Sequence, residues 1–122
     1  MGTAKIDITP ERAVPLAGFA VRGNKPMEGV RTPIYLRILF FRQRGPDGEE
    51  RRAVLASSDL IWWGSDRMPR IAERLANEWG IERGSFILNA THNHSGPQTS
   101  FRFHPLLGEA DAAYVDQLEQ RL

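Results

Sequence analysis

The segment from residue 53 to residue 90 constrains the fold most, because it predicts a strand, a helix and a second strand in that order. The first strand covers residues 53–57, and the second begins with Phe86-Ile-Leu88. Between them, apolar residues recur at helical spacing over residues 65–79. Strands joined through a helix lie parallel, and the crossover is right-handed in nearly all proteins. The segment therefore predicts a right-handed βαβ unit.

The predicted helix of this unit has an apolar stripe and marked ends. Ser65 or Asp66 is placed to cap its start, Pro69 is tolerated in its first turn, and Gly80 ends it. The stripe consists of Met68, Ile71, Ala72, Leu75 and Trp79.

Two apolar runs before this unit predict further strands. Residues 4–9 alternate between apolar and polar and stop at Pro10, which is typical of a short strand. Residues 34–42 are rich in β-branched and aromatic residues and predict a strand buried on both faces. The turn sequence Gly-Pro-Asp-Gly at residues 45–48 makes this strand the hairpin partner of residues 53–57.

The remaining segments are a long loop and a final helix. Residues 10–33 contain four prolines and three glycines, and so long a loop is uncommon unless it is functional. Residues 109–122 form an amphipathic helix that lacks a glycine or proline stop, so we expect the chain to be cut from a longer one. The predicted fold is α/β, a mixed β-sheet with a β-hairpin followed by a right-handed βαβ unit and flanking helices.

Composition excludes several classes of function. With 122 residues the chain forms one modest domain, and its net charge of +1 with interspersed signs argues against a nucleic-acid partner. The absence of cysteine excludes disulfides and thiolate zinc sites. No apolar run reaches the roughly 20 residues of a transmembrane helix, and the N-terminus does not have the pattern of a secretory signal. We expect a cytoplasmic protein, or a secreted one whose leader has been removed.

Residues that could take part in catalysis or metal binding follow both strands of the βαβ unit. Asp59 comes after the first strand, and His92 and His94 come after the second. Parallel strands end at the same edge of a sheet, which is where open α/β sheets bind ligands. In extended backbone, residues two positions apart face the same side. The two imidazoles can therefore converge on one metal ion, with Asn93 facing away.

The role of Asp59 and the number of ligands stay open at this level. Asp59 could be a ligand, an acceptor that orients a histidine, or a base. A catalytic zinc usually has three protein ligands. His104 could be the third, although a histidine in such a loop more often packs or lies on the surface.

Four further residues have competing interpretations. Ser95 beside the histidines suits a turn-stabilising hydroxyl better than a nucleophile. Asp7 is placed as an acceptor before Thr9-Pro10. Trp62 and Trp63 could line an apolar pocket or cover the helix.

Four blocks of sequence resemble the N-terminal part of the neutral/alkaline (non-lysosomal) ceramidase family, and they occur in the same order. They are Ala4-Lys-Ile-Asp-Ile-Thr-Pro10, the loop Pro15–Gly23, Leu55-Ala-Ser-Ser-Asp-Leu60, and Ala90-Thr-His-Asn-His-Ser-Gly-Pro97. The last is the most specific, and the likeness covers most of residues 3–97. The family's usual block reads His-Thr-His-Ser-Gly-Pro, so Asn93 replaces a threonine here, and Gln98-Thr99 stand where glycines often follow.

The resemblance implies a zinc-dependent hydrolase that cleaves the N-acyl (amide) bond of a lipid or small-molecule substrate with metal-activated water. It implies that His92 is a Zn²⁺ ligand and that His94 lies beside the metal and bonds the substrate or water. The βαβ topology adds the expectation that Asp59 orients a histidine. The family's other ligands, a histidine, a glutamate and a tyrosine, come from later in the chain. Residues 1–122 would then be an N-terminal fragment of one larger layered catalytic domain, inactive alone, with possible contact to a membrane surface and an unspecified oligomeric state.

Two alternatives remain. An amidohydrolase-type barrel also places a His-x-His motif at a strand end, but the predicted hairpin argues against repeated βα units. A member of the ceramidase-like family that retains the fold as a binding or structural module would lack the later ligands.

Overall fold

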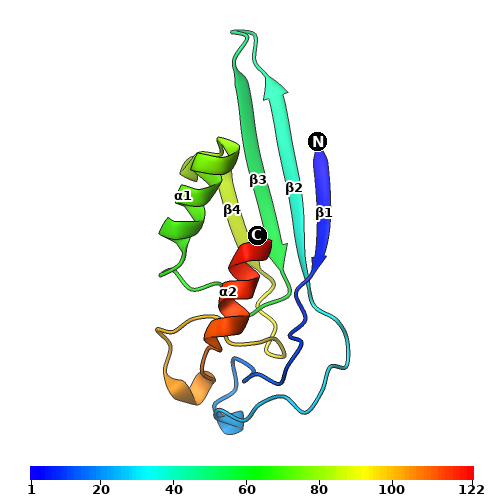
Figure 1. Ribbon diagram of the computed structural model, residues 1–122, viewed down its shortest axis with the longest axis vertical. Helices are drawn as coiled ribbons and strands as arrows, with labels where there is room; N and C mark the ends of the chain where they lie inside the picture. Colours follow the sequence, from blue (N-terminus) through cyan, green and yellow to red (C-terminus); the bar gives the residue numbers. More distant parts are fainter.

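The computed structural model describes every residue from Met1 to Leu122 and contains one sheet and two α-helices (Figure 1). The strands are β1 (Gly2–Asp7), β2 (Tyr35–Arg44), β3 (Glu50–Ser58) and β4 (Phe86–Ala90). The α-helices are α1 (Met68–Trp79) and α2 (Ala112–Arg121). Three short 3-10 helices are η1 (Ala20–Arg22), η2 (Arg83–Ser85) and η3 (Pro105–Leu107).

The sheet confirms the predicted α/β class. Its strand order is β1-β2-β3-β4, with β2 antiparallel to both β1 and β3. The pair β3 and β4 is parallel and connected through α1, as the strand–helix–strand pattern predicted. The hairpin turns at residues 45–48, where Gly48 adopts a φ of 81° that favours glycine. The hairpin extends well beyond β1 and β4 at one end of the molecule (Figure 1).

Both helices pack on the same face of the sheet and share one core with it (Figure 1). Alternate residues of the strands point to this face, and they meet Ile71 and Leu75 of α1 and Leu118 of α2. The core residues are Ile8, Val14, Leu36, Val54, Ala56, Leu60, Trp63, Ile71, Leu75, Ile81, Phe86, Tyr114, Val115 and Leu118. Neither helix is long and apolar enough to cross a membrane.

The prediction that residues 34–42 are buried on both faces is wrong for this chain. No element covers the second face, and its neighbouring side chains Phe41, Leu55 and Ile87 are 41%, 37% and 62% exposed. Leu55 and Ile87 are directly paired across β3 and β4. The second face therefore carries an apolar row that packs against nothing within residues 1–122.

The ends of α1 differ in part from the prediction. Neither Ser65 nor Asp66 caps it, because the helix starts at Met68 behind Arg67, and no side chain bonds its first turn. Gly80 ends it in the left-handed conformation, with φ at 62°. Trp79 lies at the end of the predicted stripe but is 59% exposed.

Helix α2 begins as a capped helix and is tied to the start of the chain. Asp111 accepts a hydrogen bond from the Tyr114 backbone N–H at 2.8 Å, which is a standard N-cap. The Tyr114 hydroxyl donates to the Ile8 carbonyl at 2.8 Å. Burial raises the pKa of Tyr114, so the hydroxyl keeps the proton that it donates.

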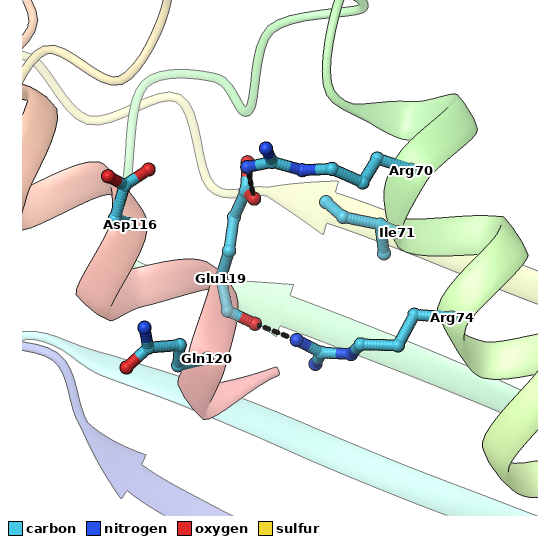
Figure 2. Close-up of a pocket in the computed structure, with 6 residues that line it drawn as sticks. All are labelled: Arg70, Ile71, Arg74, Asp116, Glu119 and Gln120. Atoms are coloured by element: carbon cyan, nitrogen blue, oxygen red, sulfur yellow. Dashed lines mark hydrogen bonds and ion pairs between the residues drawn. The ribbon is translucent and has the colours of Figure 1, made fainter.

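A buried carboxylate joins α1 to α2. Glu119, whose side chain is 8% exposed, accepts hydrogen bonds from Arg67 and Arg70, and its main-chain carbonyl accepts one from Arg74 at 2.8 Å. Figure 2 shows Arg70 and Arg74 reaching from α1 toward Glu119. The side chain of Arg67 is 10% exposed. Removing one ion of such a pair leaves the other buried without compensation.

Candidate functional site

The ends of β3 and β4 bring the predicted site residues to one edge of the sheet. Ser58 and Ala90 are the last paired residues of the two parallel strands. Beyond them the two segments stay hydrogen bonded, because the Thr91 N–H donates to Ser58 and the His92 N–H to Leu60, both at 2.9 Å. The structure thus places the segment after β3, with Asp59, beside the His-x-His segment after β4.

His92 is held in an unusual backbone conformation. Its φ is 61°, the one positive value among the non-glycine residues of the chain. The left-handed region costs an L-residue roughly 1–2 kcal/mol. The expectation of extended backbone across the two histidines was therefore wrong, since β4 ends at Ala90. Strained residues of this kind concentrate at functional sites.

The ring of His92 is oriented by a main-chain carbonyl. Its Nδ1 lies 3.0 Å from the carbonyl oxygen of Ile61. A carbonyl only accepts, so Nδ1 carries the proton and the neutral ring has its lone pair on Nε2. Metal-binding histidines have this arrangement, in which one nitrogen donates to an acceptor and the other coordinates.

His94 lies against His92 and is covered on one side by the loop of residues 15–23. The two rings meet edge to face with centroids 5.3 Å apart. The ring of Phe19 lies 4.8 Å from that of His94. The His94 Nδ1 is buried and has no hydrogen-bond partner. The two imidazoles therefore lie side by side, although extended backbone does not bring them together.

Asp59 makes its hydrogen bonds away from the histidines. Its carboxylate accepts from the Tyr35 N–H at 3.0 Å and from Arg37 at 2.8 Å and 2.9 Å. The acceptor that orients His92 is the Ile61 carbonyl. Asp59 shares the sheet edge with the histidines, and its contacts connect β2 to the segment after β3.

The two tryptophans have different surroundings. Trp62 stacks on Phe103 with centroids 3.9 Å apart and lies 6.2 Å from the His92 ring. Its Nε1 donates to the buried side chain of Gln98 at 2.6 Å. Trp63 is buried in the core and donates to the Ser58 hydroxyl at 2.8 Å. Trp62 and Phe103 thus form an aromatic surface beside His92, whereas Trp63 belongs to the core between the sheet and the helices.

The remaining candidates have local roles. His104 accepts a hydrogen bond from the Leu106 N–H at 3.2 Å and caps η3. Asp7 accepts from the Thr9 N–H at 2.8 Å, as predicted, and the hydrogen bonds from Thr9 lower the pKa of Asp7. The Ser95 N–H donates to the Asn93 side chain at 3.0 Å within the turn.

A cleft of about 620 Å³ lies on the side of the turn away from the histidines. Thr91, Asn93 and Ser95 line it, whereas His92 and His94 do not. Asn93 therefore faces away from the two imidazoles, as the alternation predicted. The opposite wall comes from the loop of residues 27–34.

Within this chain, one side chain has a donor atom that fits a metal ligand. Nowhere do three His, Asp or Glu side chains lie close enough together to hold a metal ion. The free Nε2 lone pair of His92 fits a zinc ligand, and His92 is exposed on its open side. Both histidines stood out in the sequence, but Ile61 and Phe19 did not. The only signals for them were that Ile61 closely follows the end of β3 and that Phe19 belongs to the loop of residues 15–23.

Two solved structures share the fold of this chain. One is a neutral ceramidase from Pseudomonas aeruginosa, with a TM-score of 0.74 and 24% identity. The other is a ceramidase complexed with C2, with a TM-score of 0.75 and 22% identity. Each match covers 98% of this chain, which spans only 19% of each ceramidase chain. No protein family model matches. The chain has the mixed α/β fold of the matched part of neutral ceramidase.

Proposed function

We propose that this chain is the N-terminal part of a zinc-dependent hydrolase of the neutral ceramidase type, which cleaves an N-acyl (amide) bond in a lipid or small-molecule substrate. The observation that carries the proposal is His92, which is strained and has a free Nε2 lone pair, at the strand end of a ceramidase fold. A fold uses a strained residue where function requires it. The proposal includes a cytoplasmic location, with secretion as the alternative, and possible contact with a membrane surface.

In the proposed reaction the zinc ion would polarise the amide carbonyl and make a bound water acidic enough to attack it. His92 would hold the ion through Nε2, because its Nδ1 is bonded to the Ile61 carbonyl. His94, beside it, donates a hydrogen bond to the substrate or to water. Trp62 and Phe103 provide an apolar surface next to the ligand. The other zinc ligands would come from a part of the protein outside these 122 residues.

The competing interpretations are a His-x-His amidohydrolase barrel and a non-catalytic member of the ceramidase-like family. Repeated parallel βα units build a barrel. The sheet here contains antiparallel pairs and only one parallel pair, which argues against the barrel. The non-catalytic alternative differs in the later ligands, so activity discriminates between it and the enzyme.

We expect the full-length protein to release fatty acid from a fluorogenic N-acyl-sphingosine and to lose this activity when a chelator removes zinc. Adding zinc back should restore it. The isolated chain of 122 residues should be inactive, because a catalytic zinc usually needs three protein ligands and this chain offers one. Zinc-loaded full-length protein without turnover of any N-acyl amide would support the binding-module alternative.

For Asp59 we expect the conservative change Asp59→Asn to leave zinc affinity within about twofold. A group that orients a metal ligand typically contributes 10–100-fold to affinity, but Asp59 bonds Arg37 and Tyr35 instead. Competition titrations with a chromogenic chelator would measure the affinity. A loss of about 10-fold or more would show that Asp59 orients a histidine in the complete protein.

A further inference from the structure

We propose that Arg22 is a positioning residue for His94, acting together with Gly18 and Phe19 as a clamp that presents only the Nε2 atom of His94 to the open side of the site. This assignment deepens the proposed function and rests on it for the role of His94 in the reaction. The geometry of the clamp does not depend on the metal.

The guanidinium of Arg22 joins two segments that are far apart in the sequence. Its Nη2 donates to the Ala17 carbonyl at 2.5 Å and to the His94 carbonyl at 2.6 Å, across 72 positions. Its Cζ lies 5.0 Å from the centre of the Phe19 ring, within the range of a cation–π contact. One side chain therefore fixes both the His94 backbone and the aromatic ring that covers His94.

Gly18 lies directly beneath the imidazole. A Cβ atom at this position would be 2.5 Å from Nδ1 and 2.8 Å from Cγ of His94. The φ of Gly18 is +104°, a backbone conformation that residues other than glycine rarely adopt. The ring can rest on the loop only because this residue has no side chain.

The loop is also fastened to the segment after His94. The Ala17 N–H donates to Gly96 at 2.9 Å, and the Gln98 N–H donates to Pro15 at 3.1 Å. These bonds run alongside the Arg22 contacts, so the 15–23 loop follows the His-x-His turn over several residues. Gly96 and Pro97 are both buried, and Leu16 of the loop forms an isolated bridge with Pro97.

The clamp determines which ring atom of His94 is available. Nδ1 is buried and unpartnered, whereas Nε2 is neither buried nor hydrogen bonded. A buried N–H without an acceptor is rarer in proteins than a buried acceptor without a donor. The neutral ring of His94 therefore carries its proton on Nε2. His92 has the opposite tautomer, with its proton on Nδ1. The Nε2 atom of His92 is therefore free to coordinate a metal, whereas the Nε2 atom of His94 can donate a hydrogen bond.

Selective ¹⁵N-histidine labelling of the full-length protein in its metal-free form tests this assignment directly. Two-bond ¹H–¹⁵N correlations at about pH 8, where an ordinary imidazole is neutral, identify the protonated nitrogen of each ring. Single His→Gln variants assign the signals. We expect His94 protonated on Nε2 and His92 on Nδ1 in the metal-free chain, with a cross-peak between Phe19 and His94.

Arg22→Met should abolish the Phe19–His94 cross-peak and mix the His94 tautomers, while His92 keeps its pattern. Arg22→Lys should restore much of it, because one nitrogen makes both of the Arg22 bonds. Arg52→Met is the matched control, since Arg52 also donates to a main-chain carbonyl, that of Trp79 at 2.7 Å, far from the site. Unchanged His94 signals in Arg22→Met would overturn the proposal.

In the full-length enzyme the same variant should lower kcat by about 10–100-fold with little change in KM, because small misplacements of a catalytic group have effects of that order. The labelling result needs no zinc and no substrate. If the labelling result is as expected but the full-length protein has no amidase activity, the proposed reaction is refuted and the positioning of His94 by Arg22 is supported. If Arg22→Met does not fold, the milder Arg22→Lys and the wild-type tautomers still decide the question.

Discussion

Full-length protein carrying His92→Ala or His92→Gly is expected to lose its bound zinc, from about one ion per chain to background. His92 is the residue of this chain whose geometry fits a ligand, because its Nδ1 bond to Ile61 leaves Nε2 free. Metal analysis of the purified protein after gel filtration would measure the loss. Equal zinc in wild type and variants would refute the ligand assignment and the proposed hydrolase with it.

Comparing the two variants separates loss of metal from loss of fold. At most positions alanine is more stabilising than glycine, but the φ of His92 is 61°. Glycine accepts this conformation without strain, so His92→Gly should be more stable than His92→Ala by about 1 kcal/mol. Urea unfolding of the metal-free proteins would reveal the inverted order. The usual order would mean that His92 is not held in the left-handed region.

The second large effect concerns stability. Glu119→Gln should lower the free energy of unfolding by about 3 kcal/mol, since it leaves the buried charge of Arg67 without its partner. Glu50→Gln is the matched control. Glu50 pairs with Arg52, whose side chain is 39% exposed, and such exposed pairs contribute little to stability. Equal losses in the two variants would show that the contact between α1 and α2 does not depend on this ion pair.

The dependence on pH has a defined sign. Burial alone would raise the pKa of Glu119, but the hydrogen bonds from Arg67 and Arg70 outweigh it, and the pKa lies below its ordinary value of 4.5. The ionised carboxylate therefore contributes stability that is present above about pH 4.5 and is lost as the pH falls through the lowered value. Wild type should lose stability over this range, and Glu119→Gln should lose less.

The elements of this fold could be predicted because their signals are local. Apolar spacing marks α1, and the Gly-Pro-Asp-Gly turn between two apolar runs marks the hairpin. The parallel pairing of β3 and β4 followed from their connection through a helix, and it brought Asp59 and the histidines to one edge.

The details of the site could not be predicted because they depend on contacts between distant segments. Arg37, on the neighbouring strand β2, donates hydrogen bonds to the Asp59 carboxylate, and nothing near Asp59 in the sequence indicates this contact. The left-handed conformation of His92 depends on the carbonyls of Leu60 and Ile61, some thirty positions earlier. Similarly, residues 34–42 read as buried on both faces because the sequence records apolar character but does not show which element covers each face.

The hydrogen bond from Tyr114 to Ile8 has a consequence for how the molecule folds. It spans 106 positions, and Arg22 and His94 are 72 apart. Contacts at such separations must overcome the entropy of closing long loops before they contribute, so chains rich in them fold slowly. During synthesis β1 leaves the ribosome long before α2, the helix whose Tyr114 bonds to Ile8 just beyond the end of β1. The part of the core face that α2 covers therefore stays open to solvent, and to other chains, until α2 is complete.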